Sequence, residues 1–129
     1  KAVNYGNNTF SNSSAGTFQA SVVNASITPK ATDSSIICEV CCHQWAQTSA
    51  YHKQQLRISG GITDNNVGTY ADVYCYSAIS YSGYWLWKKD TIGTTSACTF
   101  TVWVDRSYFP NNSNTGSRSW QMMLTEVAN

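Results

Sequence analysis

The sequence predicts an all-β fold, an antiparallel β-sandwich that is jelly-roll-like and has seven or eight strands. Three observations favour this class. Short stretches of alternating apolar and polar residues recur between groups of turn-forming residues. Aromatic residues make up 13% of the chain and Ser, Thr and Asn are abundant, whereas Pro occurs only 2 times. No stretch shows helical periodicity of useful length. A chain of 129 residues fits one domain, which we place at 17–129.

The first sixteen residues, 1–16, are mostly polar, with the large apolar side chain of Phe10 near their middle. They predict a loose N-terminal arm or an edge strand that is weakly specified. We expect Phe10 to contact a neighbouring subunit in an oligomer. The alternative is that Phe10 packs on its own sheet.

The stretch from Ser26 to Val40 organises the predicted sheets. A strand over residues 18–27 ends before Pro29, which lacks a backbone N–H and restricts the preceding residue to extended conformations. A second strand, over residues 35–46, opens with β-branched residues. Its side chains alternate, so one apolar set is assigned to the core: Ile36, Cys38, Val40 and Cys42. The other set is Ile37, Glu39, Cys41, His43 and Trp45.

Further strands follow the same alternation. We expect them at residues 54–59, 69–78, 84–88, 97–105 and 118–127, with turns or loops at residues 64–68, 80–83, 89–96 and 110–116. The strongest is 97–105, where four inward residues alternate with four outward ones. The inward residues are Cys98, Phe100, Val102 and Val104, and the outward ones are Ala97, Thr99, Thr101 and Trp103. Val40 and Phe100 are predicted to lie in the core between the two sheets.

The charge content excludes several classes of partner. Only 12% of residues are charged and the formal net charge is +1, so the chain has no electrostatic footprint for nucleic acid or an anionic membrane. No apolar run reaches the length of a membrane span. Because the chain begins with Lys1 and not Met, we expect a fragment or a processed form of a longer protein.

The 5 cysteines predict neither a metal site nor a catalytic centre. Cys38 and Cys41 differ by an odd number of positions, so in a regular strand their side chains point to opposite faces and cannot converge on zinc. Cys42 and His43 are neighbours in the sequence, so on a strand their side chains point apart and do not form a nucleophile–base pair, and the acidic residues are scattered. We expect no cofactor and no enzyme activity. The thiols are interpreted as free and buried, with a disulfide between Cys75 and Cys98 as the alternative.

An aromatic group around residues 74–87 is the best candidate for recognition. Aromatic rings stack on the apolar faces of sugars and anchor protein interfaces. The alternative is that many of them fill the core. The residues singled out are Tyr81, Tyr84, Trp85 and Trp87.

The two ends of the chain together resemble a domain found in virion proteins of tailed bacteriophages, including cyanophages. The opening carries Ser26-Ile27-Thr28-Pro29 followed by Ser34-Ser35-Ile36-Ile37, and the ending carries Leu124-Thr125-Glu126-Val127-Ala128. The similarity covers nearly the whole chain, except that Cys41-Cys42-His43 and residues 70–87 are not family signatures. It implies a β-sandwich that assembles with copies of itself, in tail fibres or head-surface proteins, and it carries no catalytic residues.

The resulting hypothesis is a structural protein on the virion surface, as a receptor-binding tail-fibre domain or a head decoration protein. Its expected partners are itself, as a homo-oligomer and most simply a trimer, other virion proteins, and a host surface glycan. The alternative is a free carbohydrate-binding module of the lectin kind, which would fold alone and expose Trp85 or Trp87 in a groove. An enzyme domain is the least favoured reading.

Overall fold

The structure is a computed structural model that describes residues 1–6, 10–11, 17–46, 50–75, 79–105, 108–109 and 120–129. Side chains are described at residues 1–6, 17–42, 53–68, 82–105 and 120–129. The strands are β1 (Ala2–Gly6), β2 (Phe10–Ser11), β3 (Gln19–Ile27), β4 (Ser35–Ala46), β5 (Ala50–Gly60), β6 (Asp64–Cys75), β7 (Ile79–Lys89), β8 (Cys98–Asp105), β9 (Tyr108–Phe109) and β10 (Trp120–Val127).

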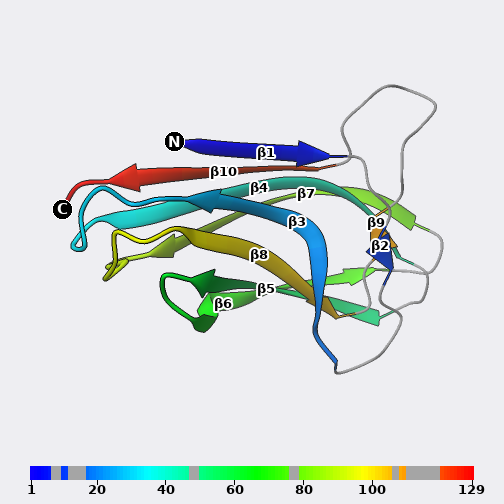
Figure 1. Cartoon of the computed structure of the whole chain (residues 1–129). Coiled ribbons are helices and arrows are strands. Elements are labelled where there is room, and N and C mark those ends of the chain that lie inside the picture. The colour runs from blue at the N-terminus through cyan, green and yellow to red at the C-terminus, as the bar shows by residue number, and fades with distance from the viewer. Residues whose placement is uncertain (7–9, 12–16, 47–49, 76–78, 106–107, 110–119) are drawn as a thin grey trace.

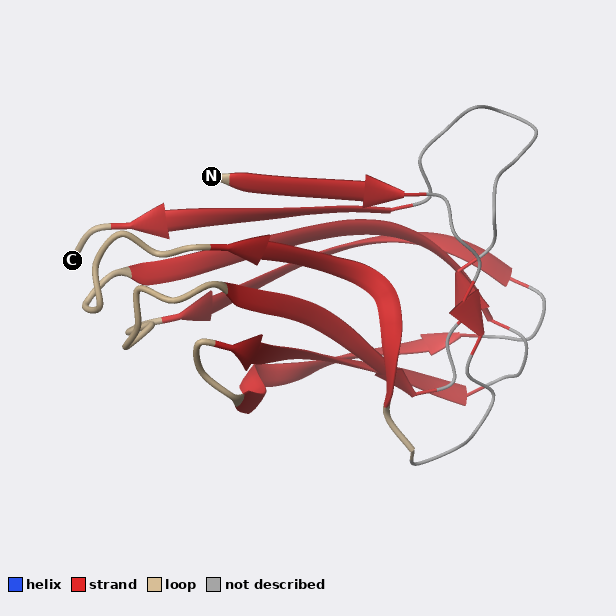
Figure 2. Cartoon of the chain, viewed as in Figure 1, coloured by secondary structure: helices blue, strands red, loops and turns tan. Residues whose placement is uncertain are grey.

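The strands form two antiparallel sheets that face each other (Figure 1). Sheet A runs β1-β10-β4 with β7 on the other side of β4 and the short β9 and β2 continuing at one end. Sheet B runs β3-β8-β5-β6. Figure 2 shows strands joined by loops, and the described residues include no helix that could cross a membrane. The predicted antiparallel sandwich is therefore confirmed, and the strand orders are compatible with the jelly-roll-like path, which stays an interpretation.

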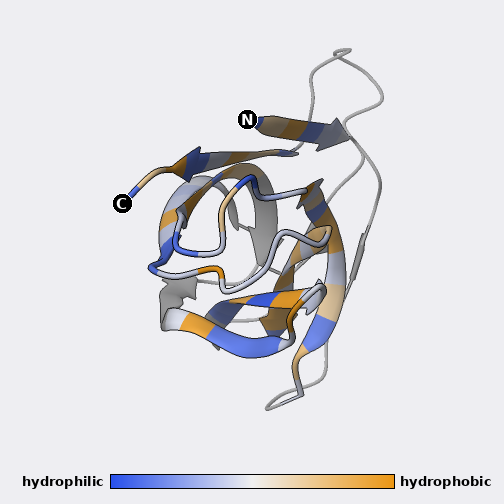
Figure 3. Cartoon of the chain, turned by 60° about the vertical axis from the view of Figure 1, so that its left-hand side comes forward, coloured by the Kyte–Doolittle hydropathy of each residue, from blue (hydrophilic) through white to orange (hydrophobic). Residues whose placement is uncertain are grey.

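Alternation of side chains builds the core, as the banding of apolar and polar residues along the strands illustrates (Figure 3). The predicted core residues Val40 and Phe100 are both fully buried, which confirms the inward faces assigned to β4 and β8. Met122 and Leu124 of β10 are also buried. The sandwich is thus filled from both sheets by regularly spaced apolar side chains.

Two predicted turns are strand in the structure. Residues 64–68 belong to β6, where the ladder with β5 is irregular between Gln54 and Ile58, and Gly68 has φ 74°. Residues 80–83 belong to β7, which pairs with β4 from Ile79 to Lys89 without interruption. In both places pairing with a neighbouring strand overrides the turn preference of Asn, Ser and Gly.

The N-terminal segment 2–6 is β1, an edge strand hydrogen-bonded to β10 of the same chain. Phe10 lies in β2, whose backbone pairs with Phe109 of β9, while the position of its side chain lies outside the described residues. The backbone of β1 is thus held within its own sheet, not extended toward a neighbour.

Strand β3 contains a large bulge opposite β8. Ala20 pairs with Trp103 and Asn24 pairs with Thr101, so β3 advances four residues where β8 advances two. Polar groups stabilise the bulge locally, since Ser21 Oγ accepts a hydrogen bond from the Val23 N–H at 3.1 Å. β3 bends sharply toward its N-terminal end in Figure 1, as bulged strands do.

Candidate functional site

The predicted recognition aromatics separate into buried and exposed residues. Trp85 and Trp87 are only 8% and 5% exposed and belong to the core, so the expectation that they form a surface groove is corrected. Tyr84, between them on β7, is 63% exposed. Strict alternation along β7 explains the difference, because neighbouring residues point to opposite faces. Tyr81 also lies in β7, and its side chain is outside the described residues.

The outward face of sheet A gathers exposed apolar side chains, and we call it the apolar face. Where side chains are described, the large exposed hydrophobic residues all lie on this sheet: Val3, Tyr5, Tyr84, Leu86 and Val127. A solvent-facing sheet surface ordinarily carries polar residues instead. The apolar face is therefore a candidate interaction surface.

Strand pairing arranges the apolar face into two rows that each cross four strands. One row is Val3, Met123, Glu39 and Leu86, and the other is Tyr5, Gln121, Cys41 and Tyr84. Adjacent strands lie about 4.8 Å apart, so the rows place Val3 and Leu86 roughly 14 Å from each other. The surface is wide enough to meet another sheet or a strand edge.

The charged group within these rows, Glu39, is already engaged. Its Oε1 accepts a hydrogen bond from the Tyr84 hydroxyl at 2.7 Å. That bond raises the pKa of Tyr84, with the negative charge of Glu39 acting in the same direction, so the phenol stays protonated and donating. The pairing reduces the cost of covering Glu39, because its carboxylate keeps one hydrogen bond when water leaves.

The cysteines of β4 alternate between faces as their odd spacing predicts. Cys38 is buried and Cys41 is exposed. Burial, followed by the adjacent charge of Glu39, raises the pKa of the Cys38 thiol to about 12, which keeps it protonated and unreactive. Cys98 is a free thiol, so the alternative disulfide with Cys75 is not formed. Among the described residues, no three or more His, Cys, Asp or Glu side chains come together to hold a metal.

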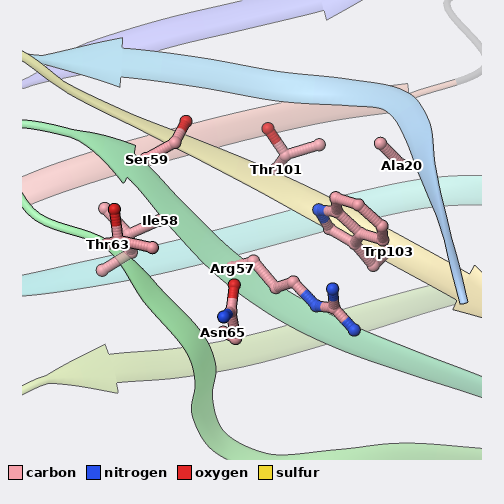
Figure 4. A pocket seen from close by; sticks show the side chains of 8 residues that line it. All are labelled: Ala20, Arg57, Ile58, Ser59, Thr63, Asn65, Thr101 and Trp103. Atoms are coloured by element: carbon pink, nitrogen blue, oxygen red, sulfur yellow. The ribbon is translucent and has the colours of Figure 1, made fainter.

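The outward face of sheet B carries a pocket of about 270 Å³, which we call the Arg57 pocket (Figure 4). It lies beside the bulge of β3. Its lining is Ala20, Arg57, Ile58, Ser59, Thr63, Asn65, Thr101 and Trp103. The described lining therefore combines one cation and one large aromatic ring with hydroxyl and amide groups, and it includes no carboxylate.

Arg57 is fixed on three sides. Its guanidinium carbon lies 4.1 Å from the centre of the Trp103 ring and 5.8 Å from that of Phe18. Its Nε donates a hydrogen bond to Gln55 Oε1 at 3.0 Å, and Gln55 Nε2 in turn donates to Asn66 Oδ1 at 2.9 Å. Stacking and the hydrogen-bond chain hold the guanidinium plane in one orientation.

Trp103 was predicted to face outward but was not among the candidate recognition residues, and neither was Arg57. The signal for Trp103 was present, since it is a large aromatic residue on the outward face of the strongest strand. The sequence held no such signal for Arg57. Its place beside Trp103 depends on the strand register, because Arg57 pairs with Thr101 and Trp103 is then its diagonal neighbour.

Comparison with protein-family models, with curated proteins and with solved structures found no match to this chain. The apolar face and the Arg57 pocket are therefore the two candidate functional sites of the described residues.

Proposed function

We propose that this chain is a structural domain on the surface of a tailed-bacteriophage particle, in a receptor-binding tail fibre or a head decoration protein. We further propose that it assembles with copies of itself through the apolar face, most simply as a trimer. The observation that carries the proposal is the clustering of exposed hydrophobic side chains on sheet A, between Val3 and Leu86. Large exposed apolar patches on soluble domains typically mark interaction sites.

A second copy of the chain is the occupant that the charges favour. The net charge is +1, so copies do not repel one another strongly. The rows of the apolar face carry two Tyr side chains and one carboxylate, in keeping with interface centres that are enriched in aromatic residues and depleted of charge. Closed rotational symmetry would cover this face without open-ended growth.

The sequence resemblance supports the virion setting. Its two motifs meet in the structure, since Glu126 of the closing motif binds the turn that follows Pro29 of the opening motif. A shared structural role explains why both motifs would occur together in a domain of this kind. Localisation on the particle is tested by finding this chain in an electron-microscopy map of the intact virion.

Sedimentation equilibrium tests the assembly directly. We expect the full chain to sediment as a trimer at micromolar concentration and Leu86→Lys to sediment as a monomer, because the substitution places a charge within the apolar face, at the β7 end of the row that begins with Val3. Ser26→Lys is the matched control, since Ser26 is exposed on β3 of the opposite sheet, and it should remain a trimer. A stable monomer for the unmodified chain contradicts self-assembly, and a trimer of Leu86→Lys contradicts the role of this face.

A free carbohydrate-binding module remains the alternative function, and the Arg57 pocket is the observation in its favour. Trp103 offers a ring at the surface, and polar side chains surround it. A module of this kind would be monomeric and would bind a saccharide unaided, so the same sedimentation experiment separates it from the virion proposal. The burial of Trp85 and Trp87 removes the groove first expected for it.

A further inference from the structure

We propose that the Arg57 pocket binds an acidic sugar, with the guanidinium of Arg57 holding the sugar carboxylate. This inference goes beyond the proposed assembly. The pocket opens on sheet B and the apolar face lies on sheet A, so either can hold without the other.

The strongest hydrogen-bond donors of the pocket, on Arg57 and Trp103, include N–H groups with no described acceptor. Arg57 uses Nε for Gln55, while none of the described residues accepts a hydrogen bond from its Nη atoms. Trp103 Nε1 likewise has no described acceptor, and Figure 4 shows this edge of the indole turned toward the side where Thr101 lies. Directed N–H groups without acceptors define where an acceptor ligand would sit.

A guanidinium group presents parallel N–H bonds that match the two oxygens of a carboxylate. Stacking on Trp103 at 4.1 Å and the bond to Gln55 hold that plane before any ligand arrives. Less side-chain entropy is then lost on binding. A freely rotating surface arginine would lack this advantage.

The described lining has one positive side chain and no negative one. The nearest carboxylate in sequence, Asp64, is occupied elsewhere: its Oδ2 lies 2.9 Å from Lys89 Nζ and its Oδ1 accepts the Asn66 N–H at 3.0 Å. Arg57 therefore keeps its full attraction for an incoming anion.

The remaining lining fits a sugar ring better than a bare anion. Ser59, Thr63, Asn65 and Thr101 supply neutral hydroxyl and amide groups, which suit sugar hydroxyls, and Ala20 supplies an apolar contact. The volume of about 270 Å³ is near the lower end of the roughly 300–1,000 Å³ usual for small-molecule sites. The pocket therefore accommodates about one monosaccharide unit.

The test is an NMR titration of the ¹⁵N-labelled full chain with sodium D-glucuronate. D-glucose is the neutral control with the same ring, and sodium sulfate is the control for a bare oxyanion. We expect saturable shifts of the Arg57 Nε–H and Trp103 Nε1–H signals with glucuronate, and binding about tenfold weaker for glucose and for sulfate. Absence of saturable shifts up to tens of millimolar glucuronate overturns the proposal, and equal binding of sulfate shows a general anion site only.

Two variants locate the binding. Arg57→Lys keeps the charge but loses the planar fork, and Ala20→Leu fills the pocket from an exposed position without changing Arg57. We expect each to weaken glucuronate binding about fivefold or more, while the other NMR signals remain those of the folded protein. Lys88→Gln, which removes a charge from the exposed face of sheet A, should bind as the unmodified chain does. Unchanged binding by Ala20→Leu and by Arg57→Lys places the glucuronate elsewhere and contradicts the proposal.

Discussion

Glu126 accepts a hydrogen bond from the backbone N–H of Lys30 at 2.7 Å, although the two residues are 96 positions apart. The same carboxylate oxygen accepts the Ala31 N–H at 3.2 Å. The end of β10 therefore closes the turn between β3 and β4. This contact gives a structural reason for the Glu of the closing motif and for its distance from the Pro29 turn.

Replacing Glu126 should make stability less dependent on pH. A hydrogen bond from Ser34, followed by the two backbone bonds, holds the pKa of Glu126 below its usual range. A lowered folded-state pKa means that the stabilisation is present above the unfolded pKa, about 4.3, and is lost as pH falls through the folded value. Glu126→Gln should therefore be less stable than the unmodified chain at pH 7, and the difference should shrink near pH 3. Urea denaturation at both pH values measures it, and a constant difference contradicts the assignment.

Gly83 should tolerate no larger residue, because Trp85 occupies the space above it. A Cβ at position 83 would lie 1.8 Å from Cη2 of Trp85. We expect Gly83→Ala to cost about 1–3 kcal/mol of unfolding free energy, the usual range for overpacking. In a Trp85→Phe background the shorter ring removes the clash, so the same substitution should cost much less. If the losses in unfolding free energy of the two substitutions simply add in urea denaturation, the Trp85 ring does not need the space above Gly83 and the prediction is wrong.

Alternation and turn chemistry predicted most of the sandwich. β4 matches its expected bounds, because an unbroken apolar face coincides with a polar connection before it. β7 was predicted to start at Tyr84, since Ser80, Ser82 and Gly83 favour a loop. In the structure these residues belong to the strand because they pair with β4, and Gly83 leaves space for the Trp85 ring. Neither binding surface could be predicted in the same way, because each depends on which strands become neighbours.

Truncating Phe100 should cost far more than truncating an outward residue of the same strand. Phe100 is fully buried between the sheets, so Phe100→Ala is expected to lower the unfolding free energy by about 3–5 kcal/mol. Thr101→Ala, half-exposed on the other face of β8, should cost less than about 1 kcal/mol. Comparable losses for the two variants in chemical denaturation would mean that the faces of β8 are reversed.

The described cysteines should differ sharply in reactivity. Cys41 is exposed, whereas Cys38, Cys42 and Cys98 are buried. In the folded Leu86→Lys variant, whose apolar face is expected to be uncovered, we expect iodoacetamide to label Cys41 and to label the other three only after unfolding in guanidinium chloride, as peptide mass spectrometry would measure. Cys41→Ser should remove the rapid labelling at this site. Rapid labelling of Cys38 in the folded chain would contradict its burial.

The number of extra residues in the β3 bulge decides how the strand can change in evolution. It adds two residues between the pairs Ala20–Trp103 and Asn24–Thr101, and two is one full period of side-chain alternation. Inward residues therefore remain inward on both sides of the bulge. Deleting two residues would restore a regular ladder and leave the core pattern intact. Deleting one would move the inward side chains of part of β3 to the outward face. Insertion or deletion of two residues in β3 would thus create or remove the Arg57 pocket beside Ala20 and leave the core of the sandwich unchanged.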